Sequence, residues 1–286
     1  MPSLVDAVRD GIVVLDGGLA TELERRGNDL SSALWSARLI EDAPDEIVAA
    51  HRAFAEAGAQ VAITASYQAP IGLMRRSVEL AREATPDGWV AASVGPYGAV
   101  RADGSEYRGD YGLSVAELRA FHRPRLEVLA GAGADVLAIE TIPCLAEVEA
   151  VLAELDALDV PAWLSITAAG TRTRAGEPAA DAFAMARDCA AVFAVGSNCV
   201  SPVDALPLVE LAARTSGKPV VVYPNSGETW DTNRRAWSGR SAFESTDVQA
   251  WIKAGARLVG GCCRVTPAEI EKLALGRRTW WTPLPG

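Results

Sequence analysis

The chain contains 286 residues, of which 49% are hydrophobic and 22% are charged, the usual balance of a water-soluble globular protein. Its 37 acidic and 27 basic residues give a formal net charge of -10, which argues against a nucleic-acid partner because phosphate binding needs a basic face. Asp6, Arg9 and Asp10 interrupt any signal peptide at the N-terminus, and no apolar run approaches the ~20 residues that cross a bilayer. We therefore expect a cytoplasmic protein with neither a membrane nor a nucleic-acid partner.

The cysteine and histidine content limits the kinds of site that the chain can build. Five cysteines, an odd number without an export signal, favour free thiols or metal ligands over a disulfide framework. The only histidines are His51 and His122, which nearly excludes a histidine-rich metal site or a Ser-His-Asp triad. Any metal site must therefore draw mainly on thiols and carboxylates.

Eight apolar runs alternate with segments of helical spacing along the chain. The runs do not alternate in polarity, which is typical of strands buried on both faces of a parallel sheet. We expect strands at residues 12–18, 61–66, 89–95, 136–141, 162–167, 192–199, 219–225 and 257–263. We expect a short helical segment before the first strand. We expect eight further helices at residues 44–57, 71–84, 115–131, 145–158, 179–190, 203–215, 246–254 and 266–275.

Eight strand–helix units in this length predict an α/β fold, a (β/α)₈ TIM barrel, formed by residues 1–286 as a single domain. A doubly wound open sheet is the structural alternative, because closure cannot be derived from the pattern alone. Two polar segments, residues 96–112 and 226–241, are longer than ordinary barrel connections, and this length favours a functional role.

Polar side chains follow nearly every expected strand at its carboxyl end, where barrel enzymes place their active sites. They are Asp16 with Gly17 and Gly18, Thr64 and Ser66, Glu140, Thr167, Cys199, Asn225 and Glu228, and Cys262 with Cys263. A carboxylate that ends an apolar strand is costly unless it is satisfied. Asp16 and Glu140 therefore favour a functional role, although a loop cap or a structural ion pair would also explain them.

Three of the five cysteines follow strands that a barrel would place close together. Cys262 and Cys263 follow the eighth strand, and Cys199 follows the sixth, with only the seventh strand between them. Three converging thiolates form a zinc site with an open fourth position, as catalytic zinc requires. A core or redox role is the alternative for these cysteines, and a packing role is our interpretation of Cys144 and Cys189.

The open position of such a zinc site indicates its chemistry. Soft thiolate ligands suit a substrate thiol, and zinc deprotonates a coordinated thiol. Three protein thiolates make the ion a poor Lewis acid for water but keep the bound sulfur electron-rich. We therefore expect alkyl transfer to sulfur rather than hydrolysis.

The motifs Asp16-Gly17-Gly18, Asn198-Cys199 and Gly260-Gly261-Cys262-Cys263-Arg264, in this order, resemble those of the homocysteine S-methyltransferases, a family of zinc-dependent (β/α)₈ barrels. The resemblance extends over nearly the whole chain. Four further segments carry it, residues 63–69, 93–98, 103–111 and 223–228. They are most similar to the branch that uses S-methylmethionine or S-adenosylmethionine as donor.

The resemblance implies a role for each matching residue. The zinc ligands would be Cys199, Cys262 and Cys263, and Asp16 and Glu140 would hold the amino group of homocysteine. Gly17 and Gly18 would let backbone amides approach its carboxylate, Asn225 would orient groups beside the metal, and Thr64 and Ser66 are further candidate substrate contacts. The sulfonium donor suits aromatic faces and carboxylates. Candidates for binding it are Tyr67, Tyr97, Tyr107, Tyr111 and Glu228.

The resemblance implies transfer of a methyl group to L-homocysteine, forming methionine, by a monomer or small homo-oligomer that binds small molecules. An alternative acceptor is selenocysteine, or another thiol or selenol, in the same pocket. An alternative of another class is a non-catalytic barrel that senses oxidants or holds structural zinc. A fourth coordination position filled by the protein would favour that alternative, and the sequence offers no evident fourth thiol or histidine to fill it.

Overall fold

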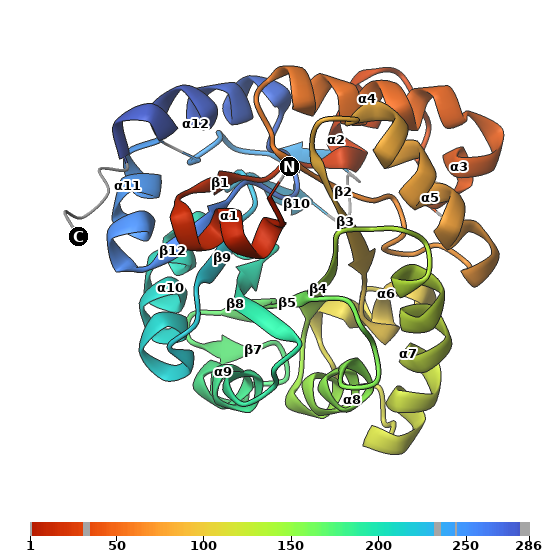
Figure 1. Ribbon diagram of the computed structural model, residues 1–286, viewed down its shortest axis with the longest axis vertical. Coiled ribbons are helices and arrows are strands. Elements are labelled where there is room, and N and C mark those ends of the chain that lie inside the picture. Colours follow the sequence, from red (N-terminus) through yellow and green to blue (C-terminus); the bar gives the residue numbers. More distant parts are fainter. Residues whose placement is uncertain (1, 31–34, 232–235, 244, 281–286) are drawn as a thin grey trace.

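The computed structural model describes residues 2–30, 35–231, 236–243 and 245–280. Its main sheet has eight parallel strands in the order β1-β12-β9-β8-β5-β4-β3-β2. The outer strands meet at a parallel bridge between Leu15 and Val61, and the Gln60 amide donates to the Val14 carbonyl at 2.8 Å. The sheet therefore closes, with helices around it (Figure 1), and the predicted (β/α)₈ barrel is confirmed over the open sheet.

All eight expected strands are present, most of them somewhat shorter than expected. They are β1 (Val13–Val14), β2 (Val61–Ile63), β3 (Trp89–Val94), β4 (Val136–Ile142), β5 (Ala162–Ile166), β8 (Val192–Asn198), β9 (Val220–Tyr223) and β12 (Ala256–Val259). Every residue of β4 is buried, as a strand between two packed layers should be. Leu137 and Ile139 pack in the cluster beneath the helices, while Val136 and Ala138 belong to a second cluster inside the barrel.

The helices that cover the barrel follow the expected spacing. Pro44 begins its helix as predicted, and Ser114 with Glu117 forms a capping box at the start of α7. The helices are α1 (Leu4–Asp10), α2 (Leu19–Arg25), α3 (Leu39–Asp42), α4 (Pro44–Glu56), α5 (Ile71–Ala84), α6 (Tyr97–Arg101), α7 (Val115–Ala130), α8 (Leu145–Leu155), α9 (Ala179–Arg187), α10 (Pro202–Ser216), α11 (Ser245–Ala254) and α12 (Pro267–Trp280). Among the described residues, none of these helices has both the length and the apolar character that a membrane crossing demands.

Several short elements lie where the sequence indicated only connections. The chain between β1 and α4 forms α2, a 3-10 turn η1 (Trp35–Arg38) and α3, and the polar segment 96–112 contains α6 and a second turn, η2 (Ser105–Tyr107). Two small hairpins also protrude from the barrel, β6–β7 (Ala168–Ala169 with Arg172–Thr173) and β10–β11 (Thr229–Asp231 with Ala236–Ser238). These additions surround the carboxyl ends of the strands.

The other mouth of the barrel is covered by α1, which lies across it in Figure 1. Leu4 and Val8 of α1 are each 1% exposed and pack in the interior cluster with Trp89 and Trp163. The barrel interior is thus filled with apolar side chains at its amino end.

Candidate metal centre and substrate pocket

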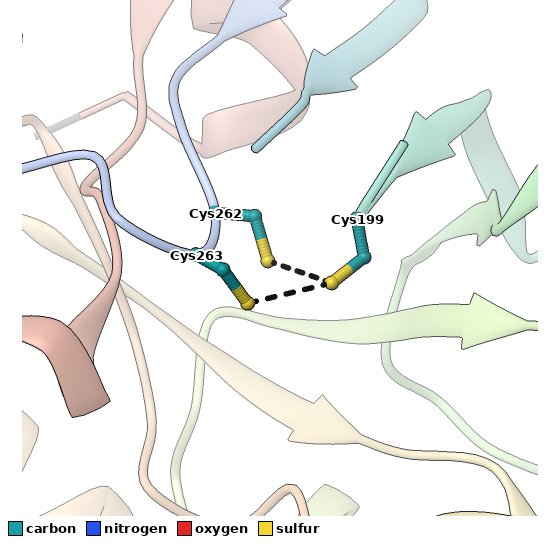
Figure 2. A group of neighbouring side chains, drawn as sticks. All are labelled: Cys199, Cys262 and Cys263. Atoms are coloured by element: carbon teal, nitrogen blue, oxygen red, sulfur yellow. Dashed lines mark hydrogen bonds between the residues drawn. The ribbon is translucent and has the colours of Figure 1, made fainter. Parts of the chain in front are cut away.

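Three thiols converge at the carboxyl end of the barrel. Cys199 follows β8, and Cys262 and Cys263 lie in the turn after β12. The Cys199 Sγ lies 3.3 Å from the Cys262 Sγ and 3.7 Å from the Cys263 Sγ, and all three sulfurs lie within 4.8 Å of one another. Figure 2 shows the three side chains pointing toward one point between the two strand ends.

This arrangement matches a single metal ion with thiolate ligands. Sulfurs ~2.3 Å from a tetrahedral ion are separated from one another by about 3.8 Å, close to the spacing observed here. Hydrogen bonds from Cys262 and Cys263 hold the pKa of Cys199 well below its usual value, which favours a thiolate in this cluster. The donor set therefore fits a thiophilic metal. Cys144 and Cys189 lie outside this cluster of sulfurs.

The backbone around Cys199 is held by a pair of reciprocal hydrogen bonds. The Thr141 amide donates to the Asn198 Oδ1 at 2.7 Å, and the Asn198 Nδ2 donates to the Thr141 Oγ1 at 2.8 Å. Both Thr141 and Cys199 have positive φ angles, 62° and 53°, a conformation that side-chain-bearing residues rarely adopt. The ends of β4 and β8 are thus locked together, and the strained turn aims the Cys199 thiol at its partners.

The turn that carries Cys262 and Cys263 is held by the strand ends on either side of it. The Cys262 amide donates to the Pro224 carbonyl at 2.8 Å, and the Cys263 amide donates to the Asn225 Oδ1 at 3.2 Å. On the other side, the Gly261 amide donates to the Asp16 carbonyl at 3.1 Å. Asn225 therefore orients the cysteine turn directly.

Three glycines, Gly17, Gly18 and Gly260, let the loops after β1 and β12 approach each other closely. A Cβ on Gly17 would lie 2.6 Å from the Val265 carbonyl oxygen, and one on Gly18 would lie 2.6 Å from that of Cys262. Gly260 is packed as tightly against Leu15 and Asp16 from the opposite loop, and Gly261 is packed against Val265 of its own loop. The Gly18 amide donates to the Val265 carbonyl at 2.9 Å. Gly18 therefore gives space beside the cysteines, while its amide is already engaged within the protein.

Two carboxylates are buried next to the thiols. Asp16 is 2% exposed, its Oδ2 accepts from the Ile63 amide at 2.8 Å, and its Oδ1 is buried without a partner among the described residues. Glu140 is 7% exposed and accepts a hydrogen bond from the Ser93 hydroxyl. Burial raises the pKa of Asp16 well above its usual value and that of Glu140 to about 7. A bound cation would relieve both.

The thiols form part of one wall of a pocket, which Glu140, Thr64, Gly17 and Gly18 also line. No lysine, arginine or histidine is among the described residues that line it. The pocket therefore has an acidic, thiol-rich interior suited to a guest that carries positive charge.

Four predicted substrate contacts lie outside the lining of this pocket, namely Asp16, Ser66, Asn225 and Glu228. The Asp16 carbonyl and the Asn225 side chain accept hydrogen bonds from the cysteine turn, whereas Ser66 and Glu228 are engaged elsewhere. The Ser66 hydroxyl donates to the Ser93 carbonyl at 2.6 Å and lies 2.7 Å from the Thr64 hydroxyl, so it is satisfied inside the barrel wall. Glu228 accepts from the Arg264 Nε at 3.2 Å and from the Ser226 hydroxyl at 2.9 Å. Both side chains stabilise the frame of the pocket in this structure.

The four candidate tyrosines divide into two pairs. Tyr67 and Tyr107 line the pocket, and the Tyr107 hydroxyl lies 3.4 Å from the Cys199 Sγ. Tyr97 and Tyr111 pack against each other instead, with ring centroids 5.2 Å apart. The segment 96–112 thus brings one tyrosine to the three thiols. In the segment 226–241, residues 232–235 lie outside the described part of the chain.

Sequence reasoning missed Glu24 and Ser36, which line the pocket from α2 and η1, and gave no role to Tyr223, which lines it from β9. The Tyr223 hydroxyl accepts from the Trp163 Nε1 at 3.0 Å, so an interior hydrogen bond fixes its ring. The spacing of Leu19 and Leu23 after the glycine pair is a helical signal that could have located α2.

Comparison with known proteins agrees with this site. A family model described as homocysteine S-methyltransferase matches residues 13–275. Homocysteine S-methyltransferase YbgG of Bacillus subtilis is 42% identical over 300 residues, covering 94% of this chain and 95% of its own. Selenocysteine Se-methyltransferase of Brassica oleracea is 40% identical over 304 residues, covering 92% of this chain and 89% of its own. The metallated form of the homocysteine methyltransferase MmuM from Escherichia coli superposes with a TM-score of 0.83 at 41% identity, covering 92% of this chain and 96% of that one.

The barrel, the thiol cluster and these matches define a methyltransferase whose site is built for a metal ion. The chain belongs to the homocysteine S-methyltransferase family.

Proposed function

We propose that this protein transfers a methyl group from a sulfonium donor, S-methylmethionine or S-adenosylmethionine, to the thiol of L-homocysteine, which forms methionine. The observation that carries the proposal is the triad of Cys199, Cys262 and Cys263, which lies in the pocket beside two buried carboxylates. The described residues that line this pocket include no cationic side chain that could pair with those carboxylates. The triad would hold Zn²⁺, because three sulfurs at this spacing suit a tetrahedral ion with one position open to substrate. When bound, zinc would keep the acceptor sulfur in its nucleophilic thiolate form at neutral pH.

The acceptor would be held by Asp16 and Glu140 through its ammonium group. Their burial without a cation in the pocket lining accounts for their raised pKa values, and an ammonium would return both to the ionised form. The Gly261 amide donates to the backbone of Asp16, so this carboxylate is positioned relative to the cysteine turn. The acceptor is thereby anchored at both its sulfur and its amino end, which orients it for transfer.

The donor would enter from the open side of the pocket, where Tyr67 and Tyr107 present aromatic rings. A sulfonium is attracted to the face of such a ring. No general base is required of the chain because the acceptor sulfur is already deprotonated. The task left to the protein is to align the donor methyl with the acceptor sulfur and to exclude water.

We also propose a domain organisation, a location and a second acceptor for this protein. Residues 1–286 would form one domain that acts on small molecules in the cytoplasm as a monomer or small homo-oligomer. Selenocysteine is a second candidate acceptor, favoured by the 40% identity to the Brassica oleracea enzyme. The observations argue against a structural-zinc or redox-sensing barrel. Among the described residues, the cluster of three cysteines includes no fourth cysteine or histidine that could fill the fourth coordination position of a metal.

The test is to measure zinc content together with methionine formation from homocysteine, with each sulfonium donor assayed separately. About one zinc per chain with methionine formed would support the proposal and identify the donor. Zinc without methionine would redirect it to selenocysteine or another acceptor. Freshly reduced protein that binds no zinc would contradict it.

A further inference from the structure

Glu24 is the second carboxylate in the lining of the pocket, and it lies on α2 next to the cysteine turn. The Arg264 amide, immediately after Cys263, donates to the Thr21 hydroxyl at 2.9 Å, which fixes α2 against that turn. Thr21 and Glu24 are three residues apart, so Glu24 lies about one turn, ~5 Å, further along the helix. Unlike the buried Glu140, Glu24 is exposed and marks the rim.

The carboxylate of Glu24 has no hydrogen-bond or ion-pair partner among the described residues. Its neighbours on α2 are engaged elsewhere, since Glu22 pairs with Arg25 at 2.8 Å and Arg26 pairs with Glu46 at 2.8 Å. The nearby Arg264 guanidinium donates to Glu228. Partial burial raises the pKa of Glu24, and attraction to Arg264 opposes that shift. Glu24 is therefore a carboxylate at the pocket entrance with its oxygens available.

We propose that Glu24 binds the α-ammonium group of the methyl donor and so selects sulfonium compounds built on an α-amino acid. This inference rests on the proposed function. The buried pair, Asp16 and Glu140, would be occupied by the acceptor ammonium, which leaves Glu24 as the remaining carboxylate in the lining.

The dimensions of such a donor agree with this position. Its reacting methyl must meet the acceptor sulfur at the cysteines, so the sulfonium lies near the floor of the pocket. Three carbon atoms separate the sulfonium from the α-ammonium, a span of about 5 Å, and Glu24 lies about one helical turn beyond the contact of Thr21 with the cysteine turn. S-methylmethionine and S-adenosylmethionine share this amino-acid portion, so Glu24 would recognise both and reject simple alkyl sulfonium ions.

The test compares wild-type protein with Glu24→Gln, which keeps the shape and the helix but removes the charge. Glu149→Gln is the matched control, because Glu149 is an exposed glutamate on α8 outside the pocket lining. We expect Glu24→Gln to raise the KM for S-methylmethionine about tenfold, as for loss of a charged hydrogen bond. The KM for homocysteine, kcat and the zinc content should stay unchanged, and the control should match wild type throughout.

A donor without the ammonium group isolates the contact. Dimethylsulfoniopropionate carries a sulfonium and a carboxylate but no amine, so wild type and Glu24→Gln should use it equally poorly. An unchanged KM for S-methylmethionine in Glu24→Gln would overturn the inference. An equal loss with both donors would also overturn it, because Glu24 would then face the sulfonium.

Calorimetric binding of S-methylmethionine separates this inference from the proposed function. If the wild type binds the donor about tenfold more tightly than Glu24→Gln but forms no methionine, the Glu24 contact holds and the proposed function fails. If methionine is formed and the two proteins bind the donor equally, the function holds and the Glu24 contact fails. Wild-type protein that neither binds nor uses the donor contradicts both.

Discussion

The two mouths of this barrel are built from the same strands but hold different kinds of side chain. Along β4 the inward positions are Val136, Ala138 and then Glu140, and along β9 they are Val221 and then Tyr223. The inner surface therefore changes from apolar to polar within two residues of the strand ends. Parallel strands place this change at the same level around the barrel, which concentrates chemistry at one mouth.

Side chains are buried almost equally at the two mouths, but burial stabilises the fold at one mouth and destabilises it at the other. Leu4 at the amino mouth is 1% exposed and Asp16 at the carboxyl mouth is 2% exposed. Burying an apolar side chain stabilises the fold by about 1.5–3 kcal/mol, whereas burying a carboxylate without its partners is unfavourable. Apolar burial at the amino mouth thus compensates for the stability that the protein loses by burying carboxylates at the carboxyl mouth.

The largest expected effect comes from removing a thiol at the polar mouth. Cys199→Ala leaves only two of the three thiols that would hold the metal, and we expect metal binding to fail and activity to fall by more than the ~100-fold that loss of an outer-shell partner costs. Cys189→Ala is the matched control, since Cys189 lies outside the sulfur cluster. Metal content by atomic spectroscopy and methyl transfer would be measured in parallel. A Cys199→Ala protein with one metal per chain and normal rate would disprove the ligand assignment.

A change at the apolar mouth should affect stability alone. Leu4→Ala opens a cavity among the side chains that fill the barrel, and we expect the free energy of unfolding to fall by about 2–5 kcal/mol. Metal content and both KM values should be unchanged in the folded protein. Denaturant unfolding measures the first effect and steady-state kinetics the second. Altered substrate affinity in this variant would show that the two mouths are coupled.

The smallest expected effect is a gain in stability that depends on pH. Glu140 has a pKa of about 7 when folded, so the folded protein keeps its proton while the unfolded chain, with a pKa near 4.5, loses it. The contribution of protonated Glu140 to the free energy of unfolding is therefore fully present below about pH 4.5, and it is lost as the pH rises through about 7. In metal-free protein, Glu140→Gln should add about 3 kcal/mol at pH 8 and nothing near pH 4. Equal Tm shifts at both pH values would contradict this assignment.

The barrel was predictable from the sequence because each of its units carries its own signal. Every strand is an apolar run of a length that only a buried strand explains, and helices such as α4 begin at Pro44 as expected. The short elements α6 and η2 escaped prediction, since they contain three to five residues and are held by contacts with other segments. The Tyr97 amide, for example, donates to Glu147 at 2.6 Å, a partner fifty residues away.

The thiol cluster was predictable because the strand order alone brings Cys199, Cys262 and Cys263 together. The same rule placed Glu140 at the pocket but could not show that Ser66 turns to the Ser93 carbonyl or that Glu228 pairs with Arg264. Those outcomes depend on side-chain directions between loops, which strand order does not determine. Glu24 was missed for a related reason, because it lies on a short helix in a connection between strand and helix.

The glycine contact between the loops after β1 and β12 has a consequence for how the protein is made. β1 is the first strand of the barrel in the sequence and β12 is the last, yet Gly17 and Gly18 pack directly on the backbone of the cysteine turn. During synthesis, the first half of the pocket must wait for almost the entire chain before its other half emerges from the ribosome. The three thiols therefore come together only in the final stage of folding, and a nascent chain that stops short of β12 has no complete place for the metal.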